Sequence, residues 1–278
     1  MINSPTTIEP LNVIDAGRAQ TWPYLQQVYR YKHLITVFAW QEIKSAYAQT
    51  YFGLAWAVLR PLLILLIFTV LFKMLLHVDT PVPYYLFAFS GMLAWNYFSQ
   101  LAISGSTAVV QQQHLIRKMY FPKTVLLLVK VLVAGLELAI SLLILLVMIT
   151  ISGIGFHAGV FLLPLFLILN AAVGFMVAVW MTALNIRFRD LNQLVPALIG
   201  IAVWFTPVFY PTTLIPDKYQ FLLCFNPLAG IIKGIRYCLL GTGFPEWQFF
   251  MAPLFCVALA FAGLVYLIKV EDKLVDSA

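Results

Sequence analysis

Ionisable residues inside the apolar stretches of the chain are the first candidates for chemistry, and they are few. Lys130 and Glu137 lie seven residues apart in one apolar stretch, a spacing that puts both on one face of a helix. A carrier driven by protons or sodium ions would use intramembrane carboxylates of this kind. One glutamate is thin support for that function, and a structural polar contact with a neighbouring helix explains it better.

Catalytic motifs are absent from the sequence. It has no GxxxxGKS/T phosphate loop, no HExxH zinc motif and no GxSxG nucleophile turn. Cys224, Cys238 and Cys256 lack metal-binding spacing. We therefore expect no catalytic residue, metal or cofactor in this chain. Cys224 and Cys238 fall in one predicted outer loop, where a disulfide is possible, although free apolar thiols are commoner.

Two groups of basic residues could meet a phosphate. Arg187-Phe188-Arg189-Asp190 is a charge cluster at a predicted inner surface, where a positive anchor is the default interpretation and attraction of an anionic headgroup the alternative. Arg60 lies near the start of the first apolar segment, from which its long side chain can reach the interface.

Aromatic residues form 15% of the chain, and most are expected in the interfacial belts of a membrane. A second interpretation is a track for sugars, because aromatic faces pack on the apolar face of a sugar ring. The candidates for this track, which we place near predicted outer ends, are Trp95, Tyr97, Trp204, Phe205, Phe209 and Tyr210.

The composition shows which elements must position these residues. The chain is 62% hydrophobic and 10% charged, with a mean hydropathy of +0.92, whereas soluble domains are about a quarter charged. This predicts an all-α polytopic membrane protein and excludes a secreted disulfide scaffold or a free cytosolic enzyme. Runs long enough to cross predict six transmembrane helices within 54–268, at about 54–76, 84–108, 124–152, 159–184, 191–210 and 248–268.

Basic residues predict the orientation of these helices. With the N-terminal segment 1–53 and the tail 269–278 in the cytoplasm, twelve Lys and Arg residues lie inside and four outside. Both termini are therefore expected to be cytoplasmic. The net charge of +6 then reflects orientation and does not indicate a nucleic-acid partner.

Residues 24–52 have helical character without enough apolar residues to cross. Trp40, Ile43, Tyr47 and Tyr51 share one predicted face, opposite Glu42, Ser45 and Gln49. This pattern predicts an amphipathic interface helix in the inner headgroup layer. A cytoplasmic helix packed on its own protein is the alternative.

Two other connecting segments are unusual. The short cytoplasmic stretch 111–123 holds large apolar residues beside a basic pair, which favours docking into another protein, although the apolar residues could also dip back into the bilayer. Prolines divide 211–247, and the apolar piece 228–240 is too short to cross. It predicts half-inserted helices that must be covered by protein or face water.

Several strings resemble the membrane subunit of polysaccharide-exporting ABC transporters. They run from Lys44 to Leu62 (KSAYAQTYFGLAWAVLRPL) with Ile67-Phe68-Thr69, then 185–191 (NIRFRDL), 206–211 (TPVFYP) and 226–229 (NPLA) with Arg236. The resemblance covers about residues 40 to 270. It implies a permease that forms a homodimer, binds two copies of an ABC ATPase that carries ATP and Mg, and exports O-antigen, capsule or teichoic-acid polymers, often lipid-linked, across the bacterial inner membrane.

The resemblance also implies roles for segments and residues. The helix at 24–52 corresponds to an interface helix, 212–241 to short outer re-entrant gate helices, and 111–123 to a coupling helix that contacts the ATPase. Arg60, Arg187 and Arg189 would meet the pyrophosphate of a lipid carrier. The coupling residues would be Leu115, Ile116, Arg117, Lys118, Met119, Tyr120 and Phe121.

Other functions stay open on the sequence alone. Within the ABC class, the nearest competitor is an exporter of drugs or small lipids. Outside this class, one alternative is an ion-coupled carrier that needs Glu137, but the sequence lacks paired intramembrane carboxylates. The other is a polytopic glycan-modifying enzyme, but the sequence lacks a catalytic constellation.

Overall fold

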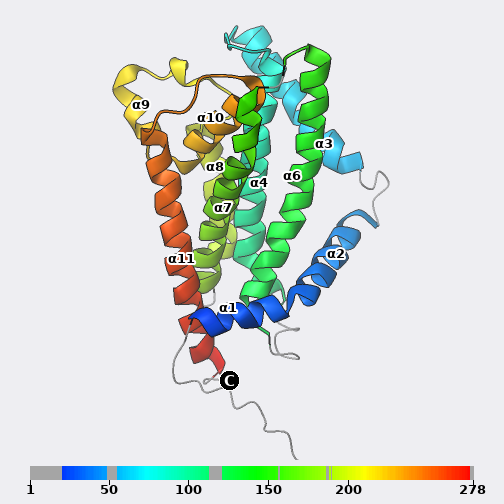
Figure 1. Ribbon diagram of the computed structural model, residues 1–278, viewed down its shortest axis with the longest axis vertical. Coiled ribbons are helices and arrows are strands. Elements are labelled where there is room, and N and C mark those ends of the chain that lie inside the picture. Colours follow the sequence, from blue (N-terminus) through cyan, green and yellow to red (C-terminus); the bar gives the residue numbers. More distant parts are fainter. Residues whose placement is uncertain are drawn as a thin grey trace, which may run out of the picture.

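The computed structural model describes residues 21–48, 55–112, 121–155, 157–185, 188 and 190–275. Every regular element in these ranges is a helix, and the longest helices run side by side in one bundle (Figure 1). The prediction of an all-α protein is confirmed for this part of the chain.

Four helical segments are long and apolar enough to cross a membrane. They are α3 (Ala55–Thr69) with η1 (Val70–Leu75), α6 (Thr124–Ser152), η2 (Ala158–Leu162) with α7 (Leu163–Asn185), and α11 (Gln248–Val275), which is apolar as far as Val270. Each matches a predicted span to within a few residues at its apolar ends.

The other two predicted spans are helical but differ from a standard crossing. The helix α4 (Tyr84–Gln111) is long enough but more polar, and α8 (Leu191–Ala202) with η3 (Val203–Phe205) is short. The predicted range 191–210 runs too far, because Thr206 precedes a proline and adopts an extended backbone. Six crossings thus stay a prediction.

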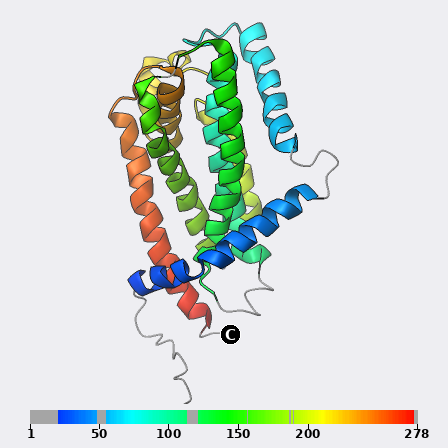
Figure 2. The same ribbon diagram turned by 45° about the vertical axis from the view of Figure 1, so that its right-hand side comes forward.

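The polar helix α4 lies at the centre of the bundle, where it packs against α6, α7 and α10 (Figure 2). Its backbone carbonyls accept hydrogen bonds from α7: Asn170 Nδ2 donates to Ala94 O at 3.0 Å and Asn185 Nδ2 to Ser106 O at 2.7 Å. Amide side chains between helices supply a hydrogen-bonding attraction that lipid-like apolar contacts cannot. These hydrogen bonds join α7 to the main chain of the central helix α4.

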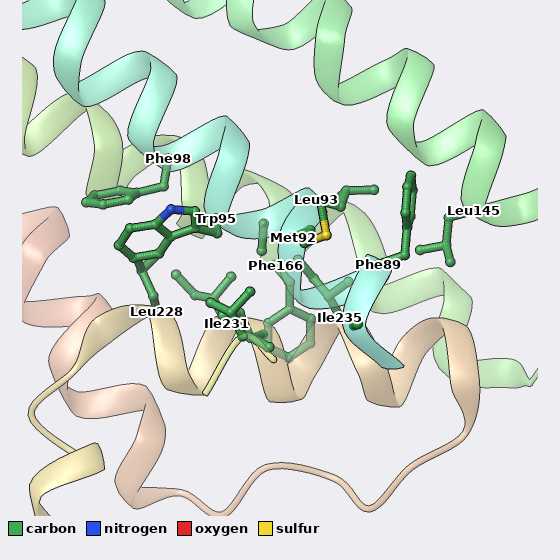
Figure 3. Packing of buried hydrophobic residues seen from close by; sticks show 14 of the residues in the cluster. Phe89, Met92, Leu93, Trp95, Phe98, Leu145, Phe166, Leu228, Ile231 and Ile235 are labelled. Atoms are coloured by element: carbon green, nitrogen blue, oxygen red, sulfur yellow. The ribbon is translucent and has the colours of Figure 1, made fainter. Parts of the chain in front are cut away.

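Figure 3 shows the main apolar core, where α4, α7 and α10 (Pro227–Leu240) meet. Phe89 and Phe166 are almost fully buried, and Ile231 and Ile235 of α10 belong to the same cluster, close to Phe166. At Gly234 a Cβ atom would lie 2.0 Å from the Phe166 ring, so only glycine allows this approach.

Three short helices occupy the region predicted to form half-inserted gate helices: η4 (Thr212–Leu214), α9 (Asp217–Leu223) and α10. Asn226 caps α10 by accepting a hydrogen bond from Leu228 N at 3.0 Å, and Gly241 ends it with a left-handed φ of 66°. The helix α10 packs between α4, α7 and α11, which bury most of its residues. Short helices in 212–241 are confirmed, whereas a gating role stays a prediction.

The helix α3 is far less packed. Within Ala55–Thr69 only Leu65 is buried, while Leu63, Leu66 and Ile67 are exposed. In Figure 2 it stands at the edge of the bundle. An apolar face of this kind suits contact with lipid or with another protein chain.

The N-terminal helix differs from its prediction in two ways. It is broken at Tyr31 into α1 (Thr21–Arg30) and α2 (Lys32–Ala48). The packed face of α2 holds Ile35 and Ala39, whereas Trp40 points away and is 68% exposed. Glu42, on the other side of the helix from Trp40, contacts α6, and the location of Trp40 in the inner headgroup layer stays a prediction. Packing on the protein's own helices, left open by the sequence, is what α2 does.

The N-terminal helix α1 and the end of α11 lie at the same end of the bundle (Figure 1). Cys224, Cys238 and Cys256 are all free thiols, of which Cys238 and Cys256 are buried. The possible Cys224–Cys238 disulfide is therefore not formed in this structure.

Candidate functional site

A groove of about 430 Å³ lies between α3, α4 and α6. Its wall is unusually polar for a position inside a bundle of apolar helices. The polar and charged residues that line it are Arg60, Asn96, Tyr97, Ser99, Gln100, Ser104, Glu137 and Ser141.

The depth of this groove follows from the helices that line it. Gln100 lies close to the middle of α4, and Glu137 is central in α6. Carboxylate and amide groups at the centre of a membrane helix are costly unless they face water or other protein. The groove is therefore the strongest candidate in the described residues for a polar path through the bundle.

Arg60 lies in this groove, not at the ends of the helices as we expected. It is exposed and lines the same wall as Asn96 and Glu137. Arg60 comes early in an apolar segment, which predicted a place at the inner interface. In the structure Trp56 and Arg60, near the start of α3, line the same groove as Gln100 and Glu137, which are central in α4 and α6. An early position in the segment therefore does not determine depth in the bundle.

The two other arginines proposed for phosphate contact, Arg187 and Arg189, lie outside the described residues. Phe188, which lies between them, is 55% exposed. Asp190, which follows Arg189, is the residue directly before α8. Their phosphate role stays a prediction.

Lys130 and Glu137 lie in different surroundings. Lys130 Nζ donates to Glu42 Oε1 of α2 and is 8% exposed, whereas Glu137 lines the groove. Lys130 thus makes a polar contact with a neighbouring helix, whereas the contact expected for Glu137 stays a prediction. Glu137 takes a different place, because seven residues of α6 carry it away from α2 and towards α3.

The six aromatic residues predicted to form one outer track are split by the structure. Trp95 and Tyr97 lie in the interior of α4, more than ten residues after its first residue, so their placement at an outer end is wrong. Trp95 is buried in the core beside Phe98 and Leu228, as Figure 3 shows. Tyr97 faces the polar groove instead.

The remaining four aromatic residues follow α8. Phe209 is buried and stacks on Phe68 of α3 with 3.5 Å between the ring centres. Tyr210 donates its hydroxyl to Trp204 O at 3.0 Å, and Trp204 and Phe205 are exposed at 58% and 71%. Only Trp204 and Phe205 therefore present most of their rings on the surface of the protomer.

Arg236 forms the most concentrated polar contact among the described residues. Its guanidinium donates to Phe87 O at 3.1 and 3.3 Å, to Pro207 O at 3.0 Å and to Val208 O at 2.7 Å. The side chain is 4% exposed. Arg236 therefore joins α10 to α4 and to residues 207–208 after α8, three segments that are far apart in the sequence. The sequence signal for this contact is an arginine inside an apolar run, which by itself does not identify the carbonyl groups that accept its hydrogen bonds.

Two further contacts strengthen this junction. Tyr84 donates its hydroxyl to Phe209 O at 2.8 Å, and Asn226 Nδ2 donates to Thr206 Oγ1 at 2.9 Å. At Gly91 a Cβ atom would lie 2.5 Å from Val208 O, so the close approach of α4 requires glycine.

Most of the predicted coupling segment lies outside the described residues: Leu115, Ile116, Arg117, Lys118, Met119 and Tyr120. Phe121 is described and is 3% exposed, packed edge-on against Phe38 of α2 with 6.2 Å between the ring centres. Its expected exposure on a docking surface is wrong, because α2 covers it.

These features define a helical membrane protein with a polar groove, which is the general form of a transporter component. The model of the ABC-2 type transporter family matches residues 33–240, and the chain belongs to this family.

Similar proteins point to one branch of transport. The chain is 28% identical over 204 residues to a protein of Klebsiella pneumoniae named O-antigen export system permease protein RfbA, covering 73% of this chain and 78% of that one. A protein of the same name from Myxococcus xanthus is 26% identical over 231 residues, covering 82% and 88%.

Proposed function

We propose that this chain is the membrane subunit of an ATP-driven exporter that moves a lipid-linked polysaccharide of the O-antigen type across the inner membrane. Membership of the ABC-2 type family and the names of the similar proteins support this function. The observation that carries the proposal is the polar groove of Arg60, Gln100 and Glu137 in the middle of apolar helices. A polymer rich in hydroxyl groups needs such a surface, and a fully apolar bundle does not provide one.

The channel is proposed to form from two copies of the chain. The faces of α3 and α8 that stay exposed are apolar, with Leu66 and Ile67 on one helix and Leu198 and Ile201 on the other. Phe68 and Trp204 lie 6.2 Å apart by ring centres, so the two helices meet at one end. A second copy covering these faces would bring two polar grooves into one assembly. A long polymer suits a continuous path better than one enclosed midplane site.

Arg60 is proposed to contact the pyrophosphate of the lipid carrier. A guanidinium recognises phosphate oxygens through paired hydrogen bonds, which neighbouring amides such as Asn96 and Gln100 can supplement. Arg187 and Arg189 are proposed to attract the same headgroup at the inner surface.

Energy is proposed to come from two copies of a separate ABC ATPase, which hold ATP and Mg. Residues 115–120 are proposed to dock on this partner, with both termini in the cytoplasm. The excess of basic residues on the predicted inner segments supports this orientation, as does the location of α1 and the end of α11 at one end of the bundle.

Export by the permease and its ATPase in sealed vesicles tests the proposal. ATP should drive accumulation of lipid-linked polymer on the far side. The variant Arg60→Gln should lower that rate about tenfold, the loss expected for one charge-assisted hydrogen bond. The matched control is Lys73→Gln, which removes an exposed cation next to α3 that pairs with Asp79 at 3.5 Å.

Two results would count against the proposal. Vesicles with intact wild-type complex that move no polymer with ATP would contradict the exporter function. Equal rates for Arg60→Gln and wild type would remove the phosphate role of Arg60.

A further inference from the structure

The helices α1 and α2 hold the beginning of α6 at three places. Tyr24 Oη and Thr124 Oγ1 share a hydrogen bond of 3.0 Å at one end. Phe38 packs on Phe121 in the middle. At the other end, Glu42 of α2 forms an ion pair with Lys130 of α6.

The ion pair differs from the other two contacts in its surroundings. It borders a second groove of about 390 Å³, which is lined by Phe38, Gln41, Ser45, Ala108, Gln112, Leu126 and Val129 as well as the pair itself. Near Ile35 and Ala39, by contrast, α2 is buried against its neighbours. The ion pair therefore joins α2 to α6 at the border of a groove, beyond the part of α2 that is buried by apolar packing.

The burial of the pair makes separation of its two charges costly. The side chain of Lys130 is 8% exposed and that of Glu42 is 32% exposed. Removing Glu42 would leave the charge of Lys130 in a largely buried position, which is more costly than losing a partner in an exposed pair. Separation of α2 from α6 is disfavoured for the same reason.

The position of the pair links two regions already described. Phe121 and Thr124, which α1 and α2 contact, directly follow the segment proposed to dock on the ATPase. Lys130 lies seven residues before Glu137, which lines the groove with Arg60. A displacement that enters at the start of α6 therefore reaches the groove through one continuous helix, and α2 moves with it only where the two are joined.

We propose that the Glu42–Lys130 ion pair makes α2 and the first half of α6 move as one unit, so that motion of the ATPase reaches the polar groove. Both are positioning residues, since neither lines that groove. The inference rests on the proposed function for the source of the motion. It adds a defined connection between the interface helix and the transport path.

The first test measures polymer exported per ATP hydrolysed by the complete permease–ATPase complex in vesicles. Glu42→Gln and Lys130→Gln should each lower this ratio about fivefold or more while ATP hydrolysis continues. The double variant Glu42→Lys with Lys130→Glu should recover most of the ratio, because it restores the pair with reversed charges. Lys44→Gln, an exposed change on α2, is the control and should match wild type.

A shortened side chain keeps the test decisive if neutral variants fail to accumulate. Glu42→Asp retains the charge but shortens its reach by one methylene, and it should also lower the ratio. Wild-type ratios in Glu42→Asp and in the neutral variants that assemble would overturn the inference. So would a correctly assembled charge-reversed variant with no recovery.

A second measurement does not depend on the cargo. Spin labels at Lys44 of α2 and Leu132 of α6 report the distance between the two helices without and with bound ATP, and both positions are exposed. This distance should stay constant in the wild-type complex and change in Glu42→Gln. Equal behaviour of the two proteins would overturn the inference alone, whereas loss of ATP-dependent export in wild type would contradict the proposed function.

Discussion

Eleven of the fourteen residues of α10 are buried, whereas on the fifteen-residue α3 only Leu65 is. The α10 region is closed by hydrogen bonds from Arg236 to three backbone carbonyls and by glycines that admit close neighbours. The α3 region leaves a polar groove and an apolar face uncovered. The difference indicates that the first region holds the bundle together and the second meets other molecules.

The largest effect expected from this comparison is on Arg236. Arg236→Met removes hydrogen bonds to Phe87, Pro207 and Val208 and leaves their carbonyls short of a donor. We expect a loss of about 3 kcal/mol or more in the free energy of unfolding. Thermal unfolding in detergent measures it. A variant as stable as wild type would break the assignment of the α10 region to stability.

Gly91→Ala should give the next largest effect. The added Cβ would lie 2.5 Å from Val208 O and 2.8 Å from Arg236 Nη2, so α4 and its neighbour must move apart. The expected loss of stability is about 1–3 kcal/mol. Gly135→Ala on α6 is the matched control, since a Cβ atom at that position would have no neighbouring atom within 4 Å. A similar change in both variants would show that close approach at Gly91 is not the cause.

Glu137→Gln should have the smallest effect on stability and a visible effect on export. The side chain is exposed in a groove, so unfolding should change by less than about 0.5 kcal/mol. Export should fall about threefold, as expected when a charged acceptor of hydrogen bonds becomes a neutral one. Thermal unfolding and vesicle transport separate the two quantities. A large loss of stability would move Glu137 into the structural region.

Hydropathy predicted the apolar helices well, because the cost of placing polar groups in lipid acts on each segment separately. The ends of α6 were predicted at 124–152, where the structure has them. The end of the segment after 191 was missed because Thr206-Pro207 breaks the helix within an apolar run.

The sequence could not predict which face of a helix is packed. On α2 the spacing of Trp40 and Ile43 indicated a membrane-facing side, but it did not identify Ile35 and the small Ala39 as the residues that pack on the bundle, where small residues let helices approach closely. The exposure expected for Phe121 was wrong because the sequence does not show that Phe38 of α2 packs on it. The hydrophobic periodicity of a helix indicates which residues share a face, but it does not show what that face contacts.

The groove itself was only partly foreseeable. Arg60 and Glu137 were singled out separately, but they lie on α3 and α6, and their contact with one cavity depends on how these helices meet α4. Arg236 shows the same limit, since its three acceptors come from residues 87, 207 and 208. Contacts between distant segments require the packed structure.

Photocrosslinking tests most directly whether the groove between α3, α4 and α6 carries the polymer. A photoreactive residue at Gln100 lies in the groove, and one at Leu143 of α6, which is 63% exposed, is the control. In the working complex, position 100 should capture labelled lipid-linked polysaccharide and lose this capture when export is blocked, while position 143 captures lipid only. Capture of polymer at position 143 and none at position 100 would contradict the account.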